Sequence, residues 1–164
     1  MIEVIDGLKN IRLLILDVDG VLTDGSLYYD KRGEAIKRFH VLDGLGIRRI
    51  MEAGLTVAVI SGRRSRIARK RLKELGIDLI REAAYDKVAA FRDIRACCPD
   101  IRDEEIAYIG DDVNDVALMK EVAVPIAVAN AMDEVKGVAR YVTRLSGGEG
   151  AVREVCDLIL RSRG

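Results

Sequence analysis

The 164-residue sequence predicts an α/β fold, a doubly wound (Rossmann-like) and mostly parallel sheet with helices on both faces. Short, nearly continuous apolar runs, typical of buried parallel strands, recur along the chain. Segments with helix caps and helix breakers lie between these runs, so strands alternate with helices. One pair of β-prone arms interrupts the alternation and predicts an inserted β-hairpin.

The expected strands are the apolar runs at residues 11–17, 55–60, 106–109 and 126–129. The expected helices are at residues 43–53, 65–75, 86–97, 113–121, 133–138 and 150–160. Asp43 and Ser65 are suited to N-cap positions, and Gly54 and Gly76 to the position just after a helix.

The β-prone arms lie in residues 26–41, on either side of a turn-like Asp30-Lys31-Arg32-Gly33. Only 40 residues separate Gly20 from Ser61, and the hairpin uses many of them. Residues 62–86 are taken up by one helix and one strand. The sequence therefore predicts a single domain over residues 1–164 with no separate cap domain.

The composition favours a soluble, globular protein over several other classes. Lys+Arg and Asp+Glu are both 27 and aromatic residues make up 4%, which argues against a nucleic-acid binder. No apolar run approaches the roughly 20 residues of a membrane span, and the N-terminus lacks a secretory signal pattern. Three cysteines without a C-x-x-C pair and a single histidine argue against zinc and disulfide frameworks and favour a reduced, cytoplasmic compartment.

Acidic and polar motifs follow three of the expected strands. These motifs are Asp17-Val18-Asp19-Gly20, Ser61-Gly62-Arg63 and Gly110-Asp111-Asp112. Because the carboxyl ends of parallel strands share one edge of the sheet, and ligands bind there, the three motifs are expected to meet in one crevice.

Crowded carboxylates at Asp17, Asp19 and Asp111 need a cation, and oxygen ligands suit Mg²⁺, which usually also meets a substrate phosphate. Asp17 could attack phosphorus and form an aspartyl phosphate. Asp19, pointing the same way if the chain is still extended there, could protonate the leaving alcohol and later activate water. Ser61 would supply a hydroxyl donor and Lys87 a positive charge.

Several of these residues also have purely structural interpretations. A lone D-x-D is a weak signal, and Asp112 and Asp115 could simply cap the following helix. The basic run from Arg64 to Lys70 is expected to be a solvated helix face, with Arg63 the better anion ligand. The Gly-Gly-Glu-Gly at residues 147–150 could be a flexible loop or lend N–H groups to an anion.

In this order, DVDGVLTD, ISGR, the lysine of YDK and GDDVND resemble the motifs of the haloacid dehalogenase superfamily of phosphotransferases. The resemblance implies Asp17 as the nucleophile and Asp19 as the acid/base. It implies Mg²⁺ on the Asp17 side chain, the Asp19 backbone carbonyl and the Asp111 side chain. It also implies that Ser61 and Lys87 hold the phosphoryl group.

A narrower resemblance covers nearly the whole chain, through GEAIKRFHVLDGLGIRR and YVTRLSGGEGAVREVCDLIL above all. It is to the branch that hydrolyses 3-deoxy-D-manno-octulosonate 8-phosphate on the route to lipopolysaccharide. The implied substrate contacts are Asp19, His40, Val41, Leu42, Asp43, Gly44, Arg48, Arg63, Arg71 and Lys87. His40 and Leu42 stand where relatives often carry Asn and Arg, and as an isolated histidine His40 is more readily structural than catalytic. A branch acting on nine-carbon keto sugar acid 9-phosphates is the alternative.

A phosphatase of a small ester needs shielding from water, and a neighbouring subunit can supply what a missing cap does not. The resemblance implies a homotetramer joined through hairpins that carry Leu27, Tyr28 and Tyr29, with C-terminal tails reaching adjacent sites. Two other hypotheses are a capless phosphatase of a bulky substrate and a non-catalytic assembly subunit. The complete set of Asp17, Asp19, Lys87 and Asp111 argues against the second of these.

Overall fold

The computed structural model describes residues 7–164, so the first six residues of the predicted domain lie outside the described part. Within that part, the main sheet has the strand order β5-β4-β1-β6-β7-β8, and every neighbouring pair is parallel. The strands are β1 Leu13–Leu16, β4 Thr56–Ile60, β5 Leu79–Arg81, β6 Ile106–Gly110, β7 Val124–Ala127 and β8 Tyr141–Val142. The fold class predicted from the sequence is confirmed.

The direction in which the chain adds strands reverses at β1. From β1 the chain continues outward through β4 and β5, and then returns to the other side of β1 to add β6, β7 and β8. Such a switch point opens a crevice at the carboxyl edge of the sheet, beside the central strand.

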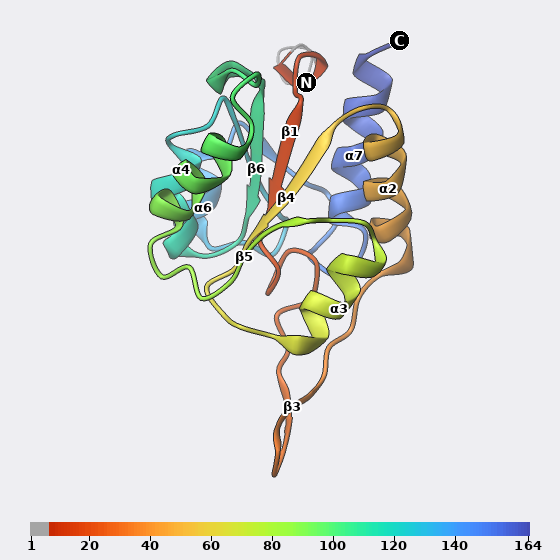
Figure 1. The fold of residues 1–164 in the computed structure, drawn as a ribbon, viewed down its shortest axis with the longest axis vertical. Helices are drawn as coiled ribbons and strands as arrows, with labels where there is room; N and C mark the ends of the chain where they lie inside the picture. Colours follow the sequence, from red (N-terminus) through yellow and green to blue (C-terminus); the bar gives the residue numbers. More distant parts are fainter. Residues whose placement is uncertain (1–6) are drawn as a thin grey trace.

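Helices cover both faces of this sheet (Figure 1). Their bounds are α2 Val41–Glu52, α3 Arg66–Glu74, α4 Lys87–Cys97, α5 Val116–Met119, α6 Asp133–Val138 and α7 Ala151–Ser162, with short 3-10 turns η1 Asp103–Glu105 and η2 Val113–Asp115. Helices α2 and α7 pack against each other on one face, and α4 and α6 lie on the other. A sheet enclosed in this way is shielded from water on both sides.

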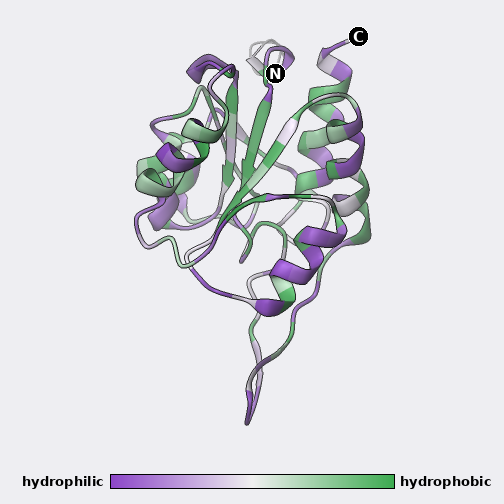
Figure 2. Cartoon of the chain, viewed as in Figure 1, coloured by the Kyte–Doolittle hydropathy of each residue, from purple (hydrophilic) through white to green (hydrophobic). Residues whose placement is uncertain are grey.

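The central strands are apolar at every position because both of their faces are buried. Leu13–Leu16 and Ile106–Gly110 are fully buried, and Val57–Ile60 of β4 are nearly so. Figure 2 shows these strands as a hydrophobic centre, whereas α3 is largely hydrophilic. At roughly 1.5–3 kcal/mol for each buried Leu, Ile or Val side chain, this core is the main favourable term in folding.

The predicted hairpin is present as β2 Tyr28–Asp30 and β3 Gly33–Ile36, paired antiparallel. In its turn, Asp30 Oδ1 accepts a hydrogen bond from the Arg32 N–H at 2.7 Å, and Gly33 has a φ of +119°. The hairpin projects away from the body of the molecule (Figure 1), and Leu27, Tyr28, Tyr29 and Ile36 on it are exposed.

Some boundaries differ from the sequence-based expectation. The last long strand begins at Val124, two residues earlier than predicted, and β8 was not predicted. The helix expected at residues 113–121 is divided into η2 and α5. Ser65 caps α3 as expected, but Asp43 does not cap α2, because that helix begins at Val41 and His40 is its N-cap. Among the described residues, no helix is long and apolar enough to cross a membrane.

Candidate active site

Three carboxylates meet at the carboxyl ends of β1 and β6. Asp17 follows β1, and Asp111 and Asp115 follow β6. One oxygen from each of the three lies within 4.8 Å of the others. The meeting follows from strand order, because β1 and β6 are neighbours and the Asp17 N–H donates to the Ile109 carbonyl at 3.1 Å.

Two glycines make this close approach possible. A Cβ atom on Gly20 would lie 1.9 Å from Asp111 Oδ2, and the φ of Gly20 is +91°. A Cβ atom on Gly110 would lie 2.7 Å from the Asp115 carboxylate. Glycine is therefore required at both positions for the carboxylates to come together.

Lys87 supplies the positive charge inside the cluster. It is the first residue of α4, which Asp86 caps, and its side chain is buried. Its Nζ lies 3.2 Å from Asp17 Oδ2 and 2.5 Å from Asp115 Oδ1. The Tyr108 hydroxyl donates to the same Asp115 oxygen at 2.6 Å. Lys87 thus bridges two of the three carboxylates, as a buried ammonium must to offset its loss of hydration.

The cluster carries more negative charge than Lys87 can balance. Burial raises the pKa of Asp17 to about 7, with Lys87 lowering it and Asp115 raising it. Burial, Asp17 and Asp115 together raise the pKa of Asp111 to about 8. Burial lowers the pKa of Lys87, but the combined effect of Asp17 and Asp115 raises it by more than burial lowers it. The net shift is upward, and the ammonium stays charged.

These residues fit a magnesium ion. All the available donors are oxygens, which Mg²⁺ prefers. Asp111 Oδ1 is buried without a hydrogen-bond partner among the described residues, which leaves a lone pair free for a cation. Because burial and the neighbouring carboxylates raise the pKa of Asp17 and Asp111, a cation at this site would favour their charged forms.

The Asp19 carboxylate is not part of the cluster of Asp17, Asp111 and Asp115. The chain turns directly after β1, where the Val18 carbonyl accepts the N–H groups of residues 21–23, so Asp19 is not on an extended strand. The condition for expecting its side chain to point the same way as that of Asp17, an extended chain, is therefore not met. Asp19 instead pairs with Lys37, and its Oδ2 lies 3.7 Å from Arg63 Nε. A metal contact through its backbone carbonyl stays a prediction.

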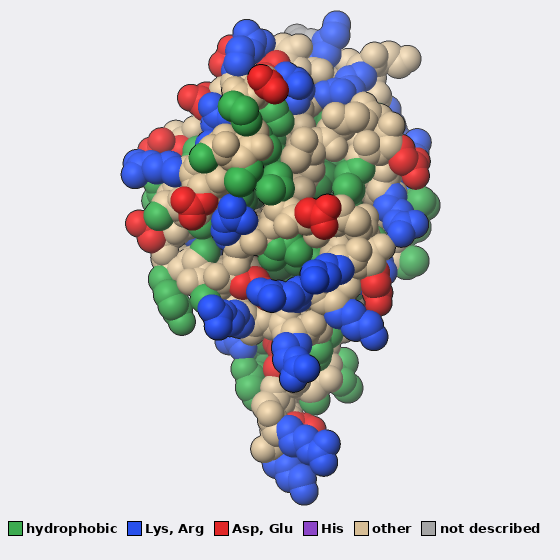
Figure 3. Space-filling view, in the orientation of Figure 1, with side chains coloured by type: hydrophobic (Ala, Val, Ile, Leu, Met, Phe, Trp, Pro, Cys, Tyr) green, Lys and Arg blue, Asp and Glu red, His purple; other side chains and the backbone are tan. Residues whose placement is uncertain are grey.

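The second motif lies on the neighbouring strand. Ser61 directly follows β4, is buried, and its Oγ accepts a hydrogen bond from the Arg63 N–H at 3.3 Å. The exposed Arg63 side chain reaches the hairpin, where its Nη2 donates to the Tyr29 hydroxyl at 2.6 Å. The remaining basic residues of this run, Arg64, Arg66, Arg69 and Lys70, are exposed as predicted. In Figure 3, Lys and Arg side chains gather over α3 and the hairpin.

The predicted substrate segment begins α2. His40 Nδ1 accepts the Leu42 N–H at 3.3 Å, which gives this histidine a capping role, while Val41 and Leu42 are exposed. Asp43 is buried and accepts the Arg153 N–H at 2.8 Å, so it ties α2 to the start of α7. These contacts give His40 and Asp43 structural roles in the chain.

Two predicted substrate arginines lie between α2 and α3. Arg71 packs on Gly44, where an added Cβ atom would be 2.4 Å from its Nη2. Arg48 Nη2 donates to the Glu74 carbonyl at 2.9 Å. Within residues 7–164, no hydrogen bond or ion pair joins either arginine to the carboxylate cluster. Their roles in substrate binding stay predictions.

Sequence reasoning did not assign Asp115 or Lys37 to the site. Asp115 does take part in capping, because its Oδ2 accepts the N–H groups of Asp111 and Asp112 at 2.9 and 3.2 Å. Its other oxygen, however, meets Lys87 and Tyr108. The signal was the third aspartate of GDDVND, one 3-10 turn after the second. For Lys37, a hairpin lysine, no sequence pattern marked burial.

The 147–150 loop does not offer free N–H groups to an anion at its two leading glycines. The Gly147 N–H donates to Asn130 Oδ1 at 2.8 Å, and the Gly148 N–H donates to the Val21 carbonyl at 3.0 Å. The loop instead packs closely against the segment that follows β1.

A family model of haloacid dehalogenase-like hydrolases matches residues 80–155, which include Lys87, Asp111 and Asp115. The α/β fold is that of this class of hydrolase. The 3-deoxy-D-manno-octulosonate 8-phosphate phosphatase of Yersinia pestis is 46% identical over 161 residues, covering 96% of this chain and 84% of that protein. The chain therefore belongs to the family of 3-deoxy-D-manno-octulosonate 8-phosphate phosphatases.

Other relatives agree. The phosphatase of Escherichia coli (strain K12) is 45% identical over 99% of this chain and 86% of its own length. The crystal structure of the Yersinia pestis phosphatase superposes with a TM-score of 0.95 at 45% identity, over 98% of this chain and 86% of that one. The crystal structure of the Moraxella catarrhalis phosphatase superposes with a TM-score of 0.95 at 39% identity, over 99% of this chain and 93% of that one. It was solved in complex with a magnesium ion, a phosphate ion and a KDO molecule.

Proposed function

We propose that this protein is a Mg²⁺-dependent phosphatase that hydrolyses 3-deoxy-D-manno-octulosonate 8-phosphate to the free sugar acid and phosphate, in the synthesis of the sugar acid of lipopolysaccharide. The observation that carries the proposal is the cluster of Asp17, Asp111 and Asp115 around Lys87 at the switch point of the sheet. Membership of this phosphatase family supports the choice of substrate.

Asp17, Asp111 and the backbone carbonyl of Asp19 would hold the metal. When bound, Mg²⁺ neutralises charge on the phosphate oxygens and on the cluster. The deprotonated Asp17 carboxylate is then available as a nucleophile. Burial raises the pKa of this carboxylate to about 7, so a cation beside it would favour its charged form.

In the first chemical step, an Asp17 oxygen bonds to phosphorus while the bond from phosphorus to the sugar oxygen breaks. Asp19 gives its proton to that leaving oxygen. In the second step, Asp19 takes a proton from water as the water oxygen bonds to phosphorus. The bond from phosphorus to Asp17 then breaks, and both aspartates return to their starting states.

Lys87 and Ser61 would hold the transferring phosphoryl group. Lys87 remains charged because two carboxylates surround it, so it offers a fixed ammonium to the phosphate oxygens. Ser61 offers a buried hydroxyl at the end of the neighbouring strand. Both groups are fixed before substrate arrives, and catalysis of phosphoryl transfer depends mainly on such positioning and on charge stabilisation.

The sugar acid would lie beyond the phosphate, toward the hairpin and the start of α2. Arg63 and Arg71 provide guanidinium groups for its carboxylate, which a planar fork binds best. The segment from His40 to Gly44 and Arg48 would complete the contact surface. The exposed Val41 and Leu42 supply its apolar part.

The working form is proposed to be a homotetramer joined through the hairpins. The hairpin exposes Leu27, Tyr28, Tyr29 and Ile36, an apolar surface suited to a partner chain. A neighbouring subunit would then supply the shield against water that no cap domain provides. The three free cysteines, Cys97, Cys98 and Cys156, support a reduced and cytoplasmic location.

A phosphate-release screen tests this function. Purified protein with Mg²⁺ is assayed with octulosonate 8-phosphate, nonulosonate 9-phosphate and simple hexose phosphates. The proposal expects the highest kcat/KM for the eight-carbon acid. A clear preference for the nine-carbon ester would assign the protein to the alternative branch, and equal rates for hexose phosphates would reject a sugar-acid site.

A further inference from the structure

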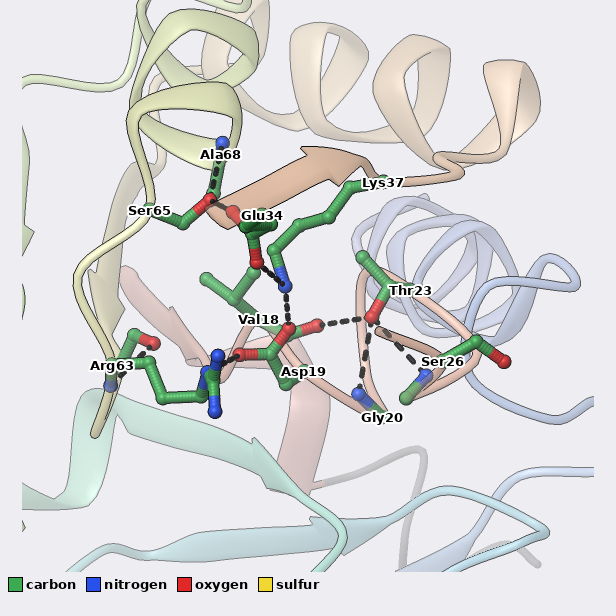
Figure 4. Close-up of polar contacts among 12 residues, drawn as sticks. Val18, Asp19, Gly20, Thr23, Ser26, Glu34, Lys37, Arg63, Ser65 and Ala68 are labelled. Carbon is green, nitrogen blue, oxygen red and sulfur yellow. Dashed lines mark hydrogen bonds and ion pairs between the residues drawn. The ribbon is translucent and has the colours of Figure 1, made fainter. Parts of the chain in front are cut away.

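Lys37 is a buried lysine immediately after β3, at the base of the hairpin. Its side chain is fully shielded from solvent, unlike the exposed Lys31 in the hairpin turn. It pairs with the Asp19 carboxylate and also lies 3.1 Å from Glu34 Oε1 (Figure 4). A buried ammonium is retained only where such partners offset its loss of hydration.

Glu34 is itself fixed in place. Its Oε2 accepts a hydrogen bond from the Ser65 hydroxyl, and Ser65 Oγ accepts the Ala68 N–H at 3.1 Å as the N-cap of α3. Burial raises the pKa of Glu34, but the combined effect of Ser65 and Lys37 lowers it by more than burial raises it. The carboxylate therefore stays charged. A continuous chain of polar contacts thus runs from the start of α3 through Glu34 and Lys37 to Asp19.

Asp19 needs such support because it lies on a turn and not on a strand. The carbonyl of Val18 accepts three N–H groups from the turn, which fixes the backbone there but not the Asp19 side chain. Arg63 Nε, 3.7 Å from Asp19 Oδ2, is half exposed and gives weaker restraint. Lys37 is the one described residue that meets the Asp19 side chain from a buried position.

We infer that Lys37 is the positioning residue for Asp19 in the phosphatase reaction, and that Glu34, anchored on Ser65, positions Lys37. The inference rests on the acid/base role proposed above for Asp19. Lys37 acts through Asp19 and does not itself meet the reacting atoms. Because Lys37 and Glu34 belong to the hairpin, the orientation of Asp19 depends on how the hairpin sits on the body of the domain.

The test compares Lys37→Met with Lys31→Met, a matched change at an exposed lysine of the same hairpin. Methionine keeps most of the side-chain length and removes the charge. For octulosonate 8-phosphate, Lys37→Met should lower kcat by about 10–100-fold, the penalty expected of a misplaced catalytic group. KM should change by less than about threefold, because the substrate contacts remain. Lys31→Met should match wild type in both.

A double-mutant cycle distinguishes a role of Lys37 through Asp19 from a merely structural role. If Lys37 acts through Asp19, then Lys37→Met added to Asp19→Asn should cost no more than about twofold beyond Asp19→Asn alone. Glu34→Gln, which keeps the shape of the side chain, should lower kcat in the same direction but less. Equal losses from Lys37→Met in both backgrounds would overturn the inference, as would wild-type kcat in the single variant.

A second readout uses 4-nitrophenyl phosphate, whose leaving group needs little protonation. Lys37→Met should release a rapid burst of about one nitrophenol per site and then turn over slowly, because only the step that activates water still needs a well-placed Asp19. A slow first turnover without a burst would reject a role through Asp19. Failure of wild type on octulosonate 8-phosphate would instead reject the proposed substrate and leave this readout intact.

Discussion

Gly147 lies so close to Gly20 that a Cβ atom on Gly147 would be 1.7 Å from the Gly20 carbonyl oxygen. Gly148, with a φ of +68°, is placed in the same way against the backbone of Thr23 and Asp24. Gly20 in turn leaves room for the Asp111 carboxylate. The loop before α7 therefore holds the segment after β1 in the shape that the carboxylate cluster needs.

Gly147→Ala should accordingly damage both stability and activity. The added methyl overlaps backbone and not a flexible side chain, so the 18–25 segment must move, and a loss of about 2–4 kcal/mol is expected from overpacking. Gly137→Ala in α6 is the control, because nothing lies within 4 Å of its added Cβ atom. It should stabilise by about 0.5–1 kcal/mol. The measurement is thermal unfolding of both variants. Equal midpoints for the two would contradict the prediction.

Asp115→Asn should be strongly destabilising in metal-free buffer. The change removes one of the two carboxylates around the buried Lys87 and one acceptor for Tyr108. Breaking a buried ion pair typically costs about 3–5 kcal/mol. The exposed Asp112 gives a matched control, since asparagine caps a helix as well as aspartate does. Urea unfolding curves that coincide for the two variants would show that Asp115 is only a cap.

The fold could be predicted from the sequence because its strands are buried on both faces and read as unbroken apolar runs. Strand β8 lies at the edge of the sheet and is only two residues long, so it shows no apolar run in the sequence. Asp17 and Asp111 were predictable because strand ends converge by topology, whereas Lys87, the first residue of α4, was expected there from its charge and the family resemblance. The direction of the Asp19 side chain and the burial of Lys37 were not, since both depend on how the hairpin and a turn pack in three dimensions.

Asp17→Asn should abolish turnover and leave the fold intact. An amide cannot serve as the nucleophile, and deleting a nucleophile typically costs ~10⁴-fold or more in kcat. The protein should lose less stability than Asp115→Asn does, because burial raises the pKa of Asp17 and makes its charged form less favourable, which offsets part of the lost contact with Lys87. Retention of more than about a tenth of the wild-type rate would refute the covalent mechanism.

Magnesium affinity should increase as pH rises through about 7 to 8. The folded metal-free protein keeps protons on Asp17 and Asp111 up to about those pH values, whereas the unfolded chain releases them near the ordinary aspartate pKa of 3.8. The free energy of unfolding of the metal-free protein should therefore fall as pH rises from about 4 to about 8, because over this range the folded state binds more protons than the unfolded chain.

Since Mg²⁺ needs the deprotonated carboxylates, the rise in Tm on adding Mg²⁺ should grow with pH between about 6 and 9. Thermal unfolding at several pH values, with and without Mg²⁺, measures this. Asp111→Asn should flatten the dependence. A magnesium-induced shift in Tm that is the same at every pH would contradict the assignment of these two carboxylates to the metal.

Changing Leu27, Tyr28 and Tyr29 to serine should dissociate the proposed tetramer. The monomers should keep their helix content but lose turnover of the sugar phosphate, because the wall contributed by the neighbour is gone. Hydrolysis of a generic aryl phosphate should survive better, since the cluster lies within one chain. Sedimentation of this variant is compared with Met132→Ser, which changes an exposed apolar residue far from the hairpin in sequence. A wild-type monomer that turns over the sugar phosphate at full rate would reject the assembly.

The contact between the 147–150 loop and the segment after β1 also has a consequence for biosynthesis. Asp17 and Asp19 leave the ribosome early, but Gly147 and Gly148, which shape their loop, are made about 130 residues later. At about 5–20 residues per second, the nascent chain spends several seconds with its first motif unsupported. Catalytic competence is thus acquired only after Gly147 and Gly148 have been made, and a nonsense mutation immediately before Gly147 should leave every candidate catalytic residue present but no formed site.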